Sequence, residues 1–289
     1  MRFAFVEDHR GEFDLRVMLR VLEVSKSGYF DWRRGRQLRA ARADQDSSLT
    51  EKIRAVHRRS KGRYGAPRVH AELREDGTRV SRKRVARLMR QAELRGKGKR
   101  KHRATTRSKT SRPVAENVLD RKFTVERPDT VWASDLTYLW TLEGWLYLAV
   151  VLDLYSRRVV GWAMGERLTE DLALNALEMA LVTRKPAPGL LHHSDRGSQY
   201  TGLVYQRRLK EAGAISSMSR KGDCWDNAVV ESFFATLKTE GVAGNLYRTR
   251  DEARAAVFEF VEVFYNRRRR HSSLGYLCPA RFEELKRAA

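Results

Sequence analysis

The sequence predicts a mixed α/β domain that is preceded by an all-helical region and followed by a C-terminal helix. Before residue 94, apolar residues recur at helical spacing. After residue 126, short β-branched and aromatic runs alternate with helical stretches. Between the two, residues 95–112 hold nine Lys or Arg, no acid and no large apolar residue. Such a stretch cannot bury enough apolar surface to offset its ordering entropy, so we expect a flexible basic linker.

Helices dominate the first part of the chain. Residues 14–22 place four apolar side chains on one helical face, and a second short helix is expected over residues 29–34. This pair fits a helix-turn-helix and fits equally a helical hairpin that only packs on its neighbours. A further apolar stripe, Leu49, Ile53 and Val56, predicts another helix, which ends in a loop near residue 60.

A strongly basic helix is predicted after Ser81, which suits an N-cap. Val85, Leu88 and Met89 form its inner face. Its remaining surface carries five cations, Arg82, Lys83, Arg84, Arg87 and Arg90. Because like charges on one short helix repel one another, we predict that these side chains contact DNA. The alternative is a basic face that stays solvated.

Strands and helices follow in a definite order after the linker. Residues 131–140, 145–153 and 158–164 read as three strands, and the short links between them predict an antiparallel meander. Then come a helix before Pro186, a strand at 189–193, a helix at 199–212, a strand at 214–218 and a helix at 226–239. Thr249 and Glu252 form a capping-box pattern that opens a C-terminal helix. Arg267–Arg270 at its end suit either the helix dipole or DNA.

Composition narrows the class of partner. The chain has 58 Lys and Arg against 36 Asp and Glu, a net charge of +22, which favours a polyanion such as nucleic acid. Charge alone does not exclude a merely basic soluble protein. Cys224 and Cys278 cannot make a zinc cluster or a disulfide framework. The longest apolar run, residues 145–152, is too short to span a bilayer, so we expect a soluble cytoplasmic protein without membrane association.

Three acids stand in apolar settings. Asp135 interrupts the first predicted strand, Asp195 follows the strand at 189–193, and Glu231 lies on a predicted helix, with 35 residues between it and Asp195. Taken singly, Asp135 could cap a turn, Asp195 could form an Asx turn and Glu231 could be a surface charge on a helix. Together, a strand, a strand end and a helix can aim three carboxylates at one point. Such an all-oxygen site suits magnesium or manganese.

Four motifs carry a resemblance to a known family. They are Trp132-Ala-Ser-Asp-Leu-Thr-Tyr138, His193-Ser-Asp-Arg-Gly-Ser-Gln-Tyr200, Asp226-Asn-Ala-Val-Val-Glu-Ser-Phe-Phe234 and Tyr265-Asn-Arg-Arg-Arg-Arg-His-Ser-Ser-Leu-Gly275. Together they resemble the second-frame product (OrfB) of bacterial insertion sequences of family three, which are DDE transposases with a retroviral-integrase-like catalytic core. The resemblance runs from roughly residue 53 to the C-terminus. It implies an RNase H-like (retroviral integrase-like) fold for the α/β core.

The resemblance also implies a chemistry: metal-dependent DNA cleavage followed by 3′-hydroxyl strand transfer at insertion-sequence ends. We expect Asp135 to bridge two Mg²⁺ ions, with Mn²⁺ able to substitute, while Asp195 holds one ion and Glu231 the other. Lys238 would contact the neighbouring phosphate, and Asn227 would orient Glu231. The rival carboxylate Asp153 is interpreted as a turn residue, and His192 and His193 as structural.

The predicted organisation and partners follow from these assignments. The segments are an N-terminal helical segment (1–47), a helix-turn-helix-like DNA-binding region (48–94), the basic linker (95–125), the catalytic core (126–245) and a C-terminal helical extension (246–289). The implied partners are insertion-sequence ends, target DNA, further copies of the chain on DNA, and an upstream OrfA protein or its OrfAB fusion. A catalytically inactive DNA-binding regulator of the same fold is the alternative function, and an RNA-strand nuclease is a third.

Overall fold

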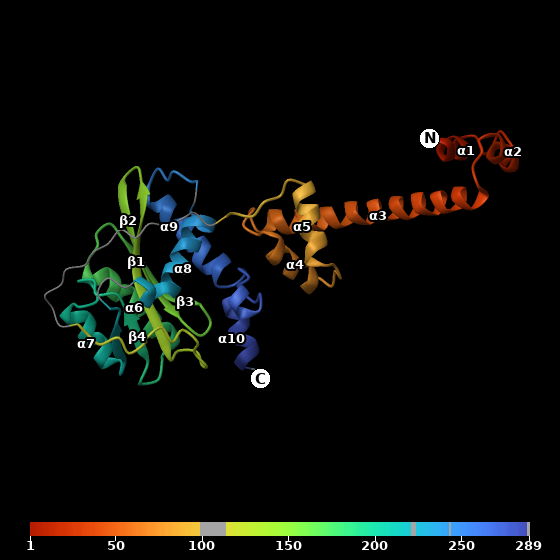
Figure 1. The fold of residues 1–289 in the computed structure, drawn as a ribbon. Helices are drawn as coiled ribbons and strands as arrows, with labels where there is room; N and C mark the ends of the chain where they lie inside the picture. Colours follow the sequence, from red (N-terminus) through yellow and green to blue (C-terminus); the bar gives the residue numbers. More distant parts are fainter. Residues whose placement is uncertain (99–113, 221–223, 243, 288–289) are drawn as a thin grey trace. The chain divides into compact units, whose positions relative to one another are not determined.

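The computed structural model describes residues 1–98, 114–220, 224–242 and 244–287 (Figure 1). Residues 99–113 of the predicted basic linker lie outside these ranges. The chain divides into two compact units, Met1–Gly96 and Lys97–Ala289. Within the described residues, no helix is both long and apolar enough to cross a membrane.

The first unit is all-helical, as predicted. Its helices are α1 (Arg2–Asp8), α2 (Leu15–Val21), α3 (Lys26–Arg59), α4 (Ala66–Glu75) and α5 (Arg82–Gln91). Val6, Met18, Leu19 and Tyr29 form a small core that joins α1, α2 and the start of α3. The Ser81 hydroxyl accepts a hydrogen bond from the Arg84 amide, which confirms the predicted cap of α5.

The long helix α3 corrects one prediction. Two separate helices were expected, at 29–34 and through Leu49–Val56, but α3 runs unbroken over 34 residues. Residues 35–48 are rich in Arg, Ala and Gln, which favour helix without adding an apolar stripe. Periodicity therefore detects only the two ends of α3, where side chains are buried.

The second unit contains the predicted α/β core. Its strands are β1 (Val131–Thr141), β2 (Gly144–Asp153), β3 (Val159–Gly165), β4 (Leu191–Ser194) and β5 (Ile215–Met218), in the order β3-β2-β1-β4-β5. β1, β2 and β3 form the antiparallel meander, whereas β4 and β5 extend the sheet in parallel from β1. Helices α6 (Glu170–Arg184) and α7 (Leu203–Glu211) make the crossovers. This order confirms the predicted fold class.

The two faces of the sheet pack against different helices. On one face, Trp132, Ala149 and Val151 share a core with α6 and with Tyr205 of α7. On the other face, Leu146 packs with Tyr247 and with Ala253 of α9 (Arg250–Phe258). β2 is a near-continuous apolar run because both of its faces are covered.

The remaining elements complete the second unit. A 3-10 turn, η1 (Cys224–Asn227), leads into α8 (Ala228–Thr236), which continues as the π-helical η2 (Leu237–Gly241). α9 opens as predicted, because the Thr249 hydroxyl accepts from the Glu252 amide and the Glu252 carboxylate accepts from the Arg248 amide. It continues as η3 (Glu259–Tyr265), followed by η4 (Ser272–Leu274) and by α10 (Pro279–Arg287), which the sequence pattern did not predict.

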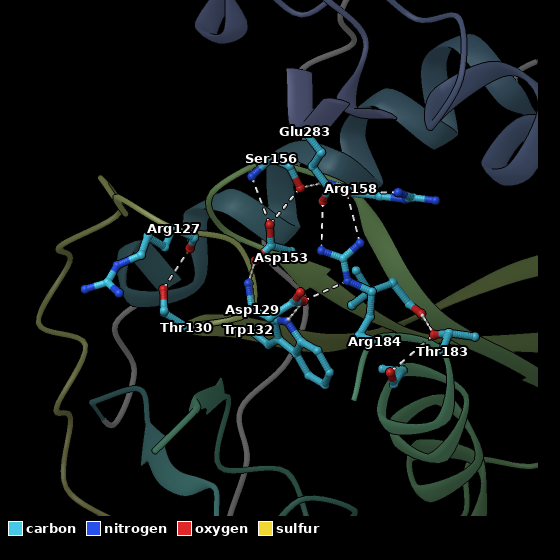
Figure 2. A network of polar contacts seen from close by, with 12 residues as sticks. Arg127, Asp129, Thr130, Trp132, Asp153, Ser156, Arg158, Thr183, Arg184 and Glu283 are labelled. Carbon is cyan, nitrogen blue, oxygen red and sulfur yellow. Dashed lines mark hydrogen bonds and ion pairs between the residues drawn. The ribbon is translucent and has the colours of Figure 1, made fainter. Parts of the chain in front are cut away.

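Figure 2 shows the polar network that holds α10 to the sheet. Arg184 of α6 forms a two-bond ion pair with Glu283 of α10, at 2.9 and 3.0 Å, and its Nε donates to Asp129 at 2.7 Å. Arg158 also donates to Glu283. These bonds satisfy a buried carboxylate that would otherwise be costly. Because the pairing is polar and long-range, no apolar pattern marks α10 in the sequence.

Asp153 at the end of β2 structures the following turn, as predicted. Its carboxylate accepts from the amide and hydroxyl of Ser156 and from the amide of Asp129 (Figure 2). The side chain is fully buried. Burial raises the pKa of Asp153 to about 6, although the hydrogen bonds from Ser156 and Asp129 oppose the shift.

This raised pKa predicts a pH-dependent stability. The unfolded carboxyl titrates near its usual 3.8, so between about pH 4 and pH 6 the folded state keeps a proton that the unfolded state has released. The stabilisation by protonated Asp153 is present below pH 4 and lost as pH rises through 6. Relative to Asp153→Asn, the wild type should lose about 3 kcal/mol of unfolding free energy across this window. Urea unfolding of both proteins between pH 4 and pH 7 checks this, and a wild type that becomes more stable relative to Asp153→Asn as pH rises would contradict it.

Candidate active site

Strand pairing places Asp135 beside Asp195. In the parallel ladder, Ala133 of β1 is the partner of His193 of β4. Asp135 comes two residues after Ala133 on β1, and Asp195 comes two residues after His193, just beyond the end of β4, so the two acids lie close enough for the Asp195 charge to act on Asp135. Each carboxylate is fixed locally, because Asp135 accepts from the Leu136 amide and Asp195 from the Gly197 amide, both at 2.8 Å.

Helix α8 carries the third acid, Glu231, in its first turn. The side-chain amide of Asn227, just before α8, donates to the Ser134 carbonyl at 3.1 Å. This bond fixes the start of the helix to the residue that precedes Asp135. Val230 and Phe233 bury the opposite side of α8, whereas Glu231 is exposed. Asn227 thus ties the start of α8 to β1, and its predicted orientation of Glu231 stays a prediction.

The three acids are close enough for their charges to interact. Burial raises the pKa of Asp135 well above its usual value, and the charges of Asp195 and Glu231 raise it further. Burial likewise raises the pKa of Asp195. In the part of the chain that the structure describes, no three His, Cys, Asp or Glu side chains already form a group that could enclose a metal ion. The structure therefore shows mutual repulsion among the acids and no closed coordination shell.

Lys238 interacts both with an acid of the site and with an aromatic side chain of β1. Its ammonium is 5.2 Å from the centre of the Tyr138 ring, a cation–π contact. Burial lowers the pKa of Lys238, while Tyr138 and Asp135 act to raise it. The lysine is half-buried between the acidic cluster and an aromatic side chain.

The two histidines before Asp195 support the strands. His192 lies 2.8 Å from the Ser134 hydroxyl and 3.1 Å from the Tyr205 hydroxyl, and the His193 ring contacts the hydroxyls of Ser217 and Ser219. Burial lowers the pKa of His192 to about 3 and of His193 to about 4, so both rings are neutral at pH 7. This agrees with the structural role that we predicted for them.

Comparison with known proteins decides the family. Models of the integrase core domain match residues 125–224 and 213–279, and a model of an HTH-like domain matches residues 44–102. Transposase InsF for insertion sequence IS3A of Escherichia coli (strain K12) is 45% identical over 283 residues, which cover 98% of each chain. The chain belongs to the IS3 transposase family. The resemblance predicted from the four motifs is confirmed.

The chain is also similar to another insertion-element protein and to a solved integrase structure. The insertion element IS600 uncharacterized 31 kDa protein of Shigella sonnei is 47% identical over 92% of this chain and 97% of that protein. Among solved structures, the HTLV-2 integrase catalytic core domain in complex with magnesium covers 54% of this chain and 97% of its own, at 16% identity and a TM-score of 0.41.

The cations predicted to contact DNA fall into two groups in this family member. Arg84 and Arg87 of α5 both pair with Asp46 of α3, at 2.8 and 2.7 Å. Arg82, Lys83 and Arg90 are exposed, and the structure shows no ion pair to them among the described residues. The helix therefore uses part of its charge to pair with α3, and the predicted contact of its cations with DNA stays a prediction.

The C-terminal arginines of the IS3-family chain also divide. Arg269 is buried and forms a two-bond ion pair with Glu240, and Arg270 donates to the Tyr276 carbonyl. Arg267 and Arg268 are exposed. The prediction gave this run to the helix dipole or to DNA, but Arg269 instead makes a tertiary ion pair.

Two residues around the site were not singled out from the sequence. Asp226 is buried and accepts from the backbone and guanidinium of Arg220, from Arg121 and from Asn117, which hold the pKa of its carboxyl well below the usual range. It fixes the entry to α8. The Tyr200 hydroxyl is buried, and no hydrogen-bond partner for it is found among the described residues. In the sequence, only the nearness of Asp226 to Glu231 and of Tyr200 to Asp195 could have drawn attention to them.

Proposed function

We propose that this protein is the catalytic subunit of a DNA transposase, which cleaves at insertion-sequence ends and joins the 3′-hydroxyl to target DNA. The observation that carries the proposal is the place of Asp135 on β1 and of Asp195 just after β4, its parallel neighbour, with the charges of Asp195 and Glu231 both acting on the Asp135 carboxyl. Membership of the IS3 transposase family supports it. The family gives the class of reaction, and the three acids give a place for it.

The acids fit a pair of divalent cations. All three donors are carboxylates, which hard cations such as Mg²⁺ prefer and Mn²⁺ accepts. Their mutual repulsion also needs positive charge between them. In the proposed arrangement Asp135 would help to hold both ions, Asp195 one of them and Glu231 the other. When bound, the ions would activate the attacking water or 3′-hydroxyl and stabilise the departing 3′ oxygen.

The surrounding residues would orient the substrate and the acids. Lys238, beside Asp135, would hold a phosphate oxygen of the strand that enters the site. Asn227 keeps α8 against β1 and so fixes the approach of Glu231. The exposed cations Arg82, Lys83 and Arg90 would contact the DNA backbone. No covalent bond between the enzyme and DNA is required.

The proposal includes partners and a setting. The substrates would be insertion-sequence ends and target DNA, bound by more than one copy of the chain. An upstream OrfA protein, alone or as an OrfAB fusion, would assist in recognising the ends. The reaction would take place in the cytoplasm, on the nucleoid.

Replacement of Glu231 by Gln tests the function. With a pre-cut end of the insertion sequence, target DNA and MgCl₂, the wild type should join the strands and Glu231→Gln should not, because the amide cannot neutralise a cation. DNA binding, measured by mobility shift, should stay within twofold for both. Glu211→Gln, on the exposed C-terminal turn of α7, is the matched control and should join normally.

The outcomes separate the competing functions. A wild type that binds the ends but joins none at any metal concentration would indicate a DNA-binding regulator that retains the fold. Cleavage of the RNA strand of a hybrid without joining of DNA would indicate a nuclease. Joining by Glu231→Gln at the wild-type rate would remove this acid from the site.

A further inference from the structure

An aromatic cluster stands exposed on the hairpin that β1 and β2 form. Tyr138, Trp140 and Trp145 are 43%, 52% and 43% exposed. Trp145 makes edge-on contacts with both other rings, with centroids 4.9 and 4.8 Å apart and planes at 80° and 72°. The three rings therefore hold one another in fixed orientations and still present surface to solvent.

The core does not account for this cluster. Pairing of Trp140 with Trp145 and of Tyr138 with Tyr147 puts the aromatic side chains on one face of the hairpin. The opposite face is packed, since Leu139 and Leu146 are buried and Leu146 contacts Tyr247 and Ala253, and on the aromatic face Tyr147 packs against the core that covers Ala149 and Val151. A hairpin already stabilised on one face has no structural need for three large aromatic side chains on the other.

Lys238 connects the cluster to the candidate active site. Tyr138 follows Asp135 by three residues on β1, so the two side chains leave opposite faces of the strand, and only the edge of β1 separates them. β4 pairs only with Val131–Ala133, so β1 has no β4 partner beside Tyr138. Lys238 occupies this position, with its ammonium 5.2 Å from the Tyr138 ring and its charge acting on the Asp135 carboxyl. A cation thus lies between the aromatic rings and the acids.

We propose that Tyr138, Trp140 and Trp145 form a stacking platform for unpaired DNA bases next to the phosphate that enters the carboxylate site. Aromatic side chains joined to a cation are the combination that binds single strands, because bases stack on the rings and the cation meets the backbone. Duplex DNA, whose bases are already stacked, would gain nothing from the platform. The inference rests on the proposed function in taking DNA as the substrate.

Binding without divalent metal tests the platform separately from catalysis. The probes are a blunt duplex and the same duplex with a short unpaired arm that contains 2-aminopurine. Trp140→Leu and Trp145→Leu, in the full-length chain, should weaken binding of the forked probe by about 5- to 150-fold and leave blunt-duplex binding unchanged. Trp140→Phe should retain most of the affinity, because it keeps an aromatic face. Phe258→Leu, at an equally exposed aromatic of α9, is the control and should bind normally.

Two further measurements keep the inference open to refutation. On the wild type, 2-aminopurine fluorescence in the arm should change as the base stacks; an unchanged signal would overturn the platform, even if the leucine variants fail to fold. Equal binding of the forked probe by wild type and folded leucine variants would also overturn it. If those variants instead alter the sedimentation of the DNA-free protein while fork binding is unchanged, the face joins two copies of the chain and the inference is wrong. Loss of joining in Glu231→Gln is independent of all these results.

Discussion

Asp135→Asn is expected to raise the thermal stability of the metal-free protein while abolishing strand transfer. In the folded state the charged form of Asp135 is disfavoured by burial and by repulsion from Asp195 and Glu231. The amide removes that repulsion at nearly constant shape. It also removes the ligand proposed to bridge both cations, so strand transfer should fall by at least about 10³-fold.

Thermal melting with and without MgCl₂ measures both consequences. The wild type should gain stability when Mg²⁺ is added, because a cation that binds only the folded state stabilises it. Asp135→Asn should melt higher than the wild type without metal and gain little from Mg²⁺. Glu211→Gln should behave as the wild type in both conditions. If Asp135→Asn melted lower without metal and still responded to Mg²⁺, Asp135 would be a structural residue.

This opposition between stability and metal binding explains why the acids could be found from the sequence. A carboxylate inside a β-branched and aromatic strand has no stabilising role of its own, so its presence points to function. The sequence pattern then placed Asp135 within a strand and Asp195 just after another, and these strands, β1 and β4, are parallel neighbours in the sheet.

The features that sequence reasoning missed have a common cause. Asp46 is 38 residues from Arg84 and 41 from Arg87, and Glu240 is 29 residues from Arg269. A polar pair across such a separation leaves no periodic pattern, and its members look like ordinary surface charges. Tyr200 was missed for the opposite reason: in a sequence it looks like any core aromatic side chain, and only its buried hydroxyl sets it apart. Local patterns predict which faces are apolar, but they do not predict which charges are paired.

The buried pair of Arg269 and Glu240 should therefore have a large and non-additive effect on stability. The Arg269 guanidinium donates twice to the Glu240 carboxylate, at 2.8 Å each, and both side chains are 7% exposed. Arg269→Met removes two charge-assisted hydrogen bonds from a buried carboxylate, and Glu240→Gln removes the negative charge that faces the guanidinium. Each single change should lower the unfolding free energy by about 3–5 kcal/mol.

The double variant Arg269→Met with Glu240→Leu decides whether the cost comes from the broken pair. Because neither charge of the pair remains, the unfolding free energy of the double variant should be well above that of either single variant and close to that of the wild type. Denaturation followed by tryptophan fluorescence reports mainly on this unit, since five of the six tryptophans lie beyond residue 97. Arg281→Met, at an exposed i, i+3 pair with Glu284, is the control and should cost less than about 1 kcal/mol. Additive losses in the double variant would show that the two side chains act through separate contacts, such as that of Arg269 with the Tyr265 ring.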